Sequence, residues 1–121
     1  MTRQLEPFTR SPYLHQVIGH SNGGRRVRFP DLACALPHLA QDAGSKWRIH
    51  YHMPLYVEHY QRLGSTYGDT RAVLALLKDQ GFSRHLEIET YTWEWLPPDL
   101  KLDLLDSLHR EYLWVLEAMA P

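Results

Sequence analysis

Histidines in one stretch of this 121-residue chain, and glutamates in another, alternate with apolar residues. The stretches are residues 47–53 and 85–92, and strict alternation is typical of a β-strand with one buried face. The polar members that share a face are His50 and His52 in the first stretch, and Glu87 and Glu89 in the second. Imidazole and carboxylate groups side by side can bind a divalent metal ion or act as an acid–base pair.

We expect these groups to face a shared interior, where a buried carboxylate must be paired, bound to a metal or protonated. His52 and Glu89, near the carboxyl ends of their strands, are the predicted catalytic residues and the predicted metal ligands. The predicted cofactor is a divalent metal ion, with Zn, Mn, Fe and Mg as candidates. The predicted substrate-binding residues are His15, His50, Glu87, Tyr91 and Trp93. The alternatives are an inert His–Glu hydrogen bond and, for the tryptophan, simple core packing.

Three strands, each followed by a helix, have to position these side chains. The predicted strands, which are rich in aromatic and β-branched residues, are residues 13–18, 47–53 and 85–92. The predicted helices are residues 30–39, 66–80 and 98–118, and the last carries an apolar stripe. Pro37 is expected to end or kink the first helix, and Gly81 to end the second.

This alternation predicts an α/β fold of three consecutive βα units that form a parallel sheet, a partial (β/α)8 TIM-barrel-like arrangement. Residues 1–12 are predicted to be an irregular N-terminal lead-in, and residues 13–121 to form the βα units. Ligands of such folds gather at the carboxyl ends of the strands, where His52 and Glu89 stand. A free-standing three-stranded α/β domain unrelated to barrels is an alternative.

Charge is balanced over the whole chain, with 13 basic and 14 acidic side chains. A net charge of −1 provides no global basic field, so we expect no nucleic-acid partner. Arg25, Arg26 and Arg28 form a local basic cluster in a predicted loop, residues 20–29. They are either an anion clamp or part of a solvated loop.

The apolar runs of the chain are all shorter than the ~20 residues that span a bilayer, so we expect no transmembrane segment. The N-terminal residues lack the apolar core of a signal peptide. Cys34 is the single cysteine, which rules out an internal disulfide. A reducing, cytoplasmic location is therefore expected.

Several segments together are similar to those of a known family. They are residues 13–17, 47–54, 63–66 and 85–93, followed by Leu96 and Pro97. In this order they resemble the C-terminal part of the metabolite traffic protein EboE family, over about residue 12 to the C-terminus. The run His-Leu-Glu-Ile-Glu-Thr-Tyr-Thr-Trp at residues 85–93 is the most specific piece.

The resemblance implies a xylose-isomerase-like TIM barrel, of the superfamily that includes sugar-phosphate isomerases. It also implies a small-molecule metabolite as partner, in the biosynthesis or trafficking of a secondary metabolite or its precursor. Superfamily members hold a divalent metal with Glu, Asp and His at strand ends, and Glu89 and His52 are the matching positions. A full barrel needs ~200 residues or more, so a missing N-terminal barrel portion or a homo-oligomer is implied. The alternative is a non-catalytic binding or scaffold module that pairs with another chain through open sheet edges.

Overall fold

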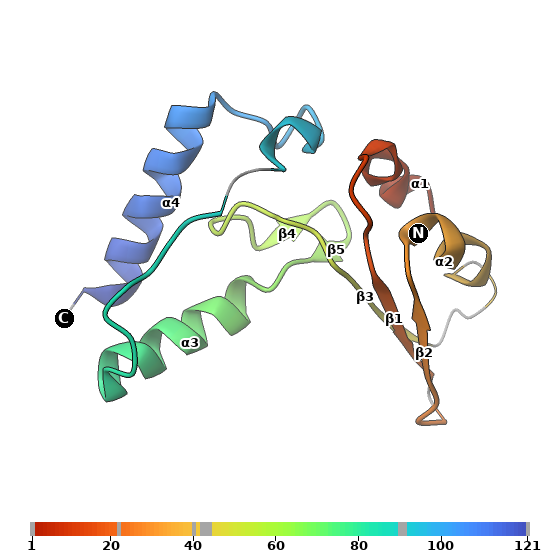
Figure 1. Cartoon of the computed structure of the whole chain (residues 1–121), viewed down its shortest axis with the longest axis horizontal. Coiled ribbons are helices and arrows are strands. Elements are labelled where there is room, and N and C mark those ends of the chain that lie inside the picture. The colour runs from red at the N-terminus through yellow and green to blue at the C-terminus, as the bar shows by residue number, and fades with distance from the viewer. Residues whose placement is uncertain (1, 22, 40, 42–44, 90–91, 121) are drawn as a thin grey trace. The chain divides into compact units, whose positions relative to one another are not determined.

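The structure, a computed structural model, describes residues 2–21, 23–39, 41, 45–89 and 92–120 (Figure 1). The chain divides into two compact units, Met1–Tyr51 (unit 1) and His52–Pro121 (unit 2). Within the described residues, none of the helices combines the length and the apolar character needed to cross a membrane.

Unit 1 is built on a three-stranded antiparallel sheet (Figure 1). Its strands are β1 (Val17–His20), β2 (Arg26–Phe29) and β3 (Lys46–Ile49), in the order β2-β1-β3. Val17 of the central strand lies opposite Phe29 on one side and Ile49 on the other. Alternate residues of the three strands are exposed, so the sheet has one inner and one outer face.

Apolar side chains from the inner face and from short helices form the core of unit 1. The helical segments are α1 (Thr2–Leu5), the 3-10 helix η1 (Glu6–Arg10) and α2 (Leu32–Leu39). The buried apolar residues are Leu5, Phe8, Val17, Leu32, Ala35 and Leu39. Gly19 is buried in the central strand, and this position requires glycine because a Cβ would lie 2.6 Å from Cζ3 of the Trp47 ring.

Asp31 joins the sheet to the start of α2. Its Oδ1 accepts a hydrogen bond from the backbone N–H of His15 at 2.8 Å. This bond, together with weaker ones from the backbone N–H groups of Leu32 and Ala33, lowers the pKa of Asp31, and partial burial opposes the shift. A carboxylate directly before a helix satisfies N–H groups that the helix itself cannot, so Asp31 caps α2.

Unit 2 combines a two-stranded hairpin with two long helices (Figure 1). Its elements are β4 (His59–Tyr60), β5 (Leu63–Gly64), α3 (Tyr67–Gln80), the 3-10 helix η2 (Trp93–Trp95) and α4 (Leu104–Met119). The helices α3 and α4 pack together, with the ring centroids of Tyr67 and Trp114 5.1 Å apart. The buried side chains of unit 2 are Pro54, Tyr60, Leu74, Leu77, Trp93, Pro97, Ser107 and Glu111.

The predicted parallel sheet of three βα units is wrong, since both sheets are small and antiparallel. After β1 the chain reverses at once: Gly24 has φ 79°, and Ser21 N–H donates to the Arg25 carbonyl at 3.0 Å. No helix follows β1 directly, because this turn leads into β2. Its Arg-Val-Arg-Phe sequence alternates like a strand, so the predicted loop over residues 20–29 is wrong for residues 26–29.

The predicted strand at residues 85–92 is also absent from its described part, residues 85–89 and 92. The strands that the structure describes in unit 2 are two residues long and pair with each other. The alternating residues 85–89 therefore have no described strand to pair with, and they do not form a strand themselves. Residues 2–10, predicted to be irregular, form helical turns that bury Phe8.

The three predicted helices are confirmed, with changed boundaries. Pro37 lies inside α2, which ends soon after it at Leu39. Gly81 ends α3 in a left-handed conformation (φ 63°), and its N–H donates to the Leu77 carbonyl at 2.7 Å. The last helix begins at Leu104, later than predicted, because the Asp103 side chain caps it by accepting from Leu105 N–H.

We expect Asp31→Ala to lower the free energy of unfolding of unit 1 by about 1 kcal/mol, because it removes a helix cap. The pKa of Asp31 is lowered by folding, so the stabilisation is present above its ordinary pKa of 3.8 and is lost as the pH falls through the lower folded value. Hydrogen exchange of the β1 amides, measured over a pH series, tests this. Asp31→Asn keeps the acceptor without the charge and should weaken the pH dependence. Wild-type exchange in Asp31→Ala would contradict the capping role.

Candidate functional site

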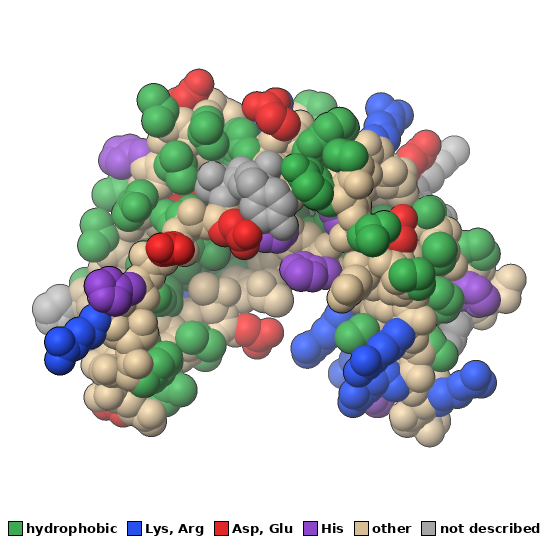
Figure 2. Space-filling model, viewed as in Figure 1, with side chains coloured by type: hydrophobic (Ala, Val, Ile, Leu, Met, Phe, Trp, Pro, Cys, Tyr) green, Lys and Arg blue, Asp and Glu red, His purple; other side chains and the backbone are tan. Residues whose placement is uncertain are grey.

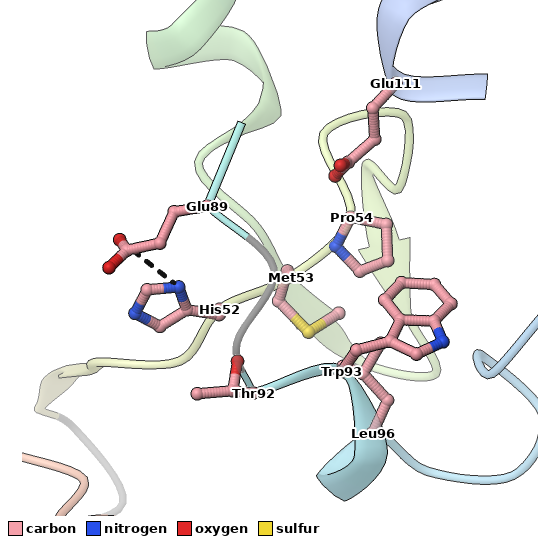
Figure 3. A pocket seen from close by; sticks show the side chains of 8 residues that line it. All are labelled: His52, Met53, Pro54, Glu89, Thr92, Trp93, Leu96 and Glu111. Atoms are coloured by element: carbon pink, nitrogen blue, oxygen red, sulfur yellow. Dashed lines mark ion pairs between the residues drawn. The ribbon is translucent and has the colours of Figure 1, made fainter. Parts of the chain in front are cut away.

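A small pocket in unit 2 brings together three segments that are distant in sequence (Figure 3). They are the loop before β4, the segment that leads into η2, and α4. The lining residues are His52, Met53, Pro54, Glu89, Thr92, Trp93, Leu96 and Glu111. The pocket volume is about 20 Å³, which is room for one water molecule or one polar group of a larger ligand.

His52 and Glu89 form an ion pair in this pocket (Figure 3). The distance from His52 Nδ1 to Glu89 Oε2 is 3.9 Å, and the side chains are 27% and 67% exposed. That separation is longer than a hydrogen bond, so the attraction depends on a protonated imidazole. Because water screens such an exposed pair, its contribution to stability is about 0–1 kcal/mol. The contact between the two side chains therefore adds little to the stability of the fold.

Glu111 contributes a buried carboxylate from α4. The residue is 5% exposed, and its Oε1 accepts a hydrogen bond from Leu55 N–H at 2.9 Å. Its Oε2 is buried and has no hydrogen-bond partner among the residues that the structure describes. Burial raises the pKa of Glu111, and the bond from Leu55 partly opposes this shift. A carboxyl group in this state can accept a hydrogen bond from a ligand or, when protonated, donate one.

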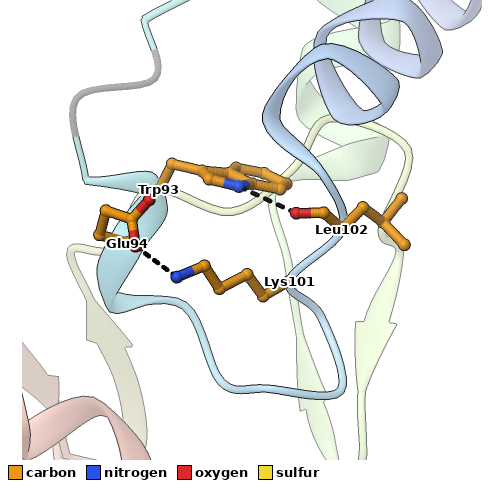
Figure 4. Close-up of polar contacts among 4 residues, drawn as sticks. All are labelled: Trp93, Glu94, Lys101 and Leu102. Carbon is orange, nitrogen blue, oxygen red and sulfur yellow. Dashed lines mark hydrogen bonds and ion pairs between the residues drawn. The ribbon is translucent and has the colours of Figure 1, made fainter.

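Trp93 forms a wall of the pocket, and the indole lies beside Pro54 (Figure 3). Its Nε1–H donates to the Leu102 carbonyl at 3.2 Å, which ties η2 to the segment before α4 (Figure 4). Glu94 and Lys101 form an ion pair between the same two segments. Trp93 is buried, so it serves mainly as a fixed part of the core, and one part of it lines the pocket.

The structure brings together three of the predicted site residues, His52, Glu89 and Trp93. They come from loops and a 3-10 helix rather than from the ends of parallel strands. Glu87 is exposed and lies outside the pocket lining. Tyr91 lies outside the described residues.

His15 and His50 belong to unit 1. The His15 ring is buried against Tyr51, with ring centroids 4.2 Å apart, and its Nδ1 lies 3.1 Å from the His50 carbonyl oxygen. Burial raises the pKa of the Tyr51 hydroxyl. His50 itself is exposed. The contacts of His15 are those of a core residue that holds the strand segments of unit 1 together.

A complete set of metal ligands is not present in the described part of the chain. No group of three or more His, Cys, Asp or Glu side chains there is placed to hold a metal ion. His52 and Glu89 together would be two protein ligands, whereas a catalytic zinc site uses three. These two side chains do not by themselves fit a metal site, and the divalent ion stays a prediction.

Glu111 was missing from the predicted site, although the sequence carries a signal for it. It stands at the helical spacing of Leu104, Leu108 and Val115, so a carboxylate interrupts the apolar stripe. If the face of the helix that carries this stripe is buried, the carboxylate is buried with it; otherwise the leucines of the stripe are exposed. Both outcomes occur in α4, where Glu111 is buried and much of the stripe is exposed.

Comparisons of the chain with protein-family models, with curated proteins and with solved structures found no match. The resemblance to the EboE family therefore stays a prediction. The parallel barrel arrangement that it implied is wrong for this chain.

We expect Glu111→Gln to be at least as stable as the wild type at neutral pH, because it keeps an acceptor for Leu55 N–H without a buried charge. With the pKa of Glu111 raised by folding, its favourable contribution is full below the ordinary value of 4.5 and is lost as the pH rises through the folded pKa. Denaturant unfolding at a series of pH values should show that the free energy of unfolding falls less with rising pH in the variant than in the wild type. Glu117→Gln, which removes an exposed charge from α4, is the matched control. An unchanged pH profile in Glu111→Gln would show that the carboxyl group is not buried.

Proposed function

We propose that unit 2 binds a small polyol or sugar-like metabolite through the pocket around Glu111. The observation that carries this proposal is the buried Oε2 of Glu111, which has no hydrogen-bond partner among the described residues. An unpaired buried acceptor costs about 1–3 kcal/mol, and a ligand hydroxyl that donates to it removes this cost. The metabolite class also agrees with what the resemblance to the EboE family implies.

The other lining residues support a hydroxylated ligand. The pocket has room for one polar group, so a single hydroxyl fits inside and the rest of the ligand lies at the mouth. There, His52 and Glu89 are exposed enough to hydrogen-bond further hydroxyls. The Trp93 ring provides an apolar wall for the carbon skeleton.

The same groups have the chemistry for proton transfer, which an isomerase-like reaction requires. In such a reaction Glu89 would take the proton and His52 would orient the substrate. Glu111, whose pKa burial raises, would be a second carboxyl group within reach of the substrate. Binding is the first step of this proposal, and catalysis depends on it.

Titration of ¹⁵N-labelled protein with xylitol, D-xylose and myo-inositol tests the proposal. We expect at least one of them to shift the Leu55 amide and the Trp93 indole resonances, which report on the two sides of the pocket. The double variant His52→Ala/Glu89→Ala should bind about tenfold more weakly, a loss of ~1.4 kcal/mol. Glu58→Ala/His59→Ala removes the same two residue types from exposed positions of unit 2 and is the matched control. Equal affinities of the two double variants, or no shift with any probe, would contradict the proposal.

A second candidate function is self-association through α4. On the apolar stripe of α4, Leu105 is 73% and Leu116 64% exposed, whereas Ser107 and Glu111, on the side of the helix opposite these two leucines, are buried. Ser107 Oγ lies 3.2 Å from the hydroxyl of Tyr56, so the inner face of α4 carries polar groups where an apolar stripe would be expected. The outer face is apolar and is bordered by charges of both signs, which suits pairing with a second copy of the chain.

We expect the chain to form a dimer whose dissociation shows in light scattering across a dilution series. Leu105→Glu/Leu116→Glu should yield a monomer, because it places charges on the stripe. Val73→Glu/Leu76→Glu makes the same change on exposed apolar positions of α3 and should leave the dimer intact. A wild-type monomer at all concentrations would rule out self-association.

A further inference from the structure

The outer face of the three-stranded sheet in unit 1 is covered by basic side chains. The exposed positions of the strands occur in two rows, set by the strand register. Arg26, His20 and Lys46 form one row, and Arg28, Ile18 and Arg48 form the other. Arg25 is exposed in the adjoining turn. Figure 2 shows Lys and Arg side chains gathered over the strands of unit 1.

Geometry makes these cations act together. Neighbouring strands are ~4.8 Å apart, and alternate residues of a strand are ~6.7 Å apart, so the rows span about 10 Å. That is about one Debye length at 0.1 M salt, within which exposed charges still interact. Among the described residues, none of Arg25, Arg26, Arg28, Lys46 and Arg48 forms an ion pair. The face therefore concentrates positive charge that none of the described carboxylates neutralises through an ion pair.

The net charge of the whole chain hides this concentration. Unit 1 contains seven Lys and Arg against three Asp and Glu, whereas unit 2 contains six against eleven. The formal charges are therefore +4 and −5 with histidine neutral. The expectation of no nucleic-acid partner followed from the overall charge of −1, an average over two units of opposite sign.

The composition of the face favours nucleic-acid phosphates over other anionic partners. Guanidinium groups donate two parallel hydrogen bonds to a phosphate, and four of the five cations are arginines. A protein interface or a membrane surface would call for apolar or aromatic anchors. In the strands of this face, the one apolar member is Ile18, whereas Trp47 and Phe29 occupy the alternate, half-buried positions.

The absence of aromatic residues from the exposed strand positions also distinguishes duplexes from single strands. Proteins that bind single strands without sequence preference stack the bases on aromatic side chains. A face of cations without such rings lacks a stacking platform for bases, which favours contact with the phosphates of a duplex. We propose that the outer face of the β2-β1-β3 sheet binds the phosphodiester backbone of duplex nucleic acid without reading its sequence. This proposal rests on unit 1 and is independent of the metabolite pocket.

Fluorescence anisotropy of the full chain with a labelled DNA duplex tests the proposal. We expect a Kd of about 1–100 μM near physiological salt, as for other non-specific binding. The slope of the logarithm of the binding constant against the logarithm of the salt concentration should be about −4.5, since each of the five cations neutralises one phosphate and each phosphate contributes ~0.9. Arg28→Gln/Arg48→Gln, which removes the two arginines beside Ile18, should weaken binding and reduce the slope by about 2.

The matched control is Arg62→Gln/Arg84→Gln, which removes the same charge from exposed positions of unit 2 and should bind as the wild type does. Circular dichroism of both variants checks that the fold is kept. Equal loss of binding in the two variants would overturn the proposal, because only overall charge would then matter. Tighter binding to a single strand of equal length, or to phosphatidylserine vesicles, would also overturn it.

Discussion

The candidate site depends on one hydrogen bond, from the backbone N–H of Leu55 to Oε1 of Glu111. It holds a carboxylate of α4 against the loop that carries His52, and it satisfies only one of the two carboxylate oxygens. Burial raises the pKa of Glu111 because water is excluded from the charged form. This bond stabilises the orientation of α4 in which Glu111 is buried and several leucines of the helix are exposed. The bond thus links helix orientation, pocket chemistry and the exposed apolar face.

Local sequence signals predicted the helices well and the sheet poorly. Gly81 ends α3 through its own backbone conformation, which needs no distant partner. Strands, by contrast, exist only where a second strand is available, so the alternation at residues 85–89 did not produce one. The turn at residues 21–25 decided the sheet topology, and its Gly-rich sequence indicated a turn without indicating that residues 26–29 pair back.

The site was predictable only where its residues could be recognised from local sequence patterns. His52 and Glu89 lie close together in the structure, although the strand geometry used to place them is wrong. Glu111 could be found only by noticing that a charge interrupts an apolar stripe, and its partner Leu55 is remote in sequence. The net charge of the whole chain hid the basic face of the sheet in unit 1, because the opposite charges of the two units nearly cancel.

The most direct measurement is an NMR titration of the Glu111 side-chain carboxyl carbon, with and without a polyol. The account predicts a pKa above the ordinary value of 4.5 in the free protein, and a further change when a ligand hydroxyl bonds to Oε2. Glu117 on the same helix provides an exposed reference carboxyl group. A Glu111 pKa at its ordinary value, with no response to any polyol, would contradict the account.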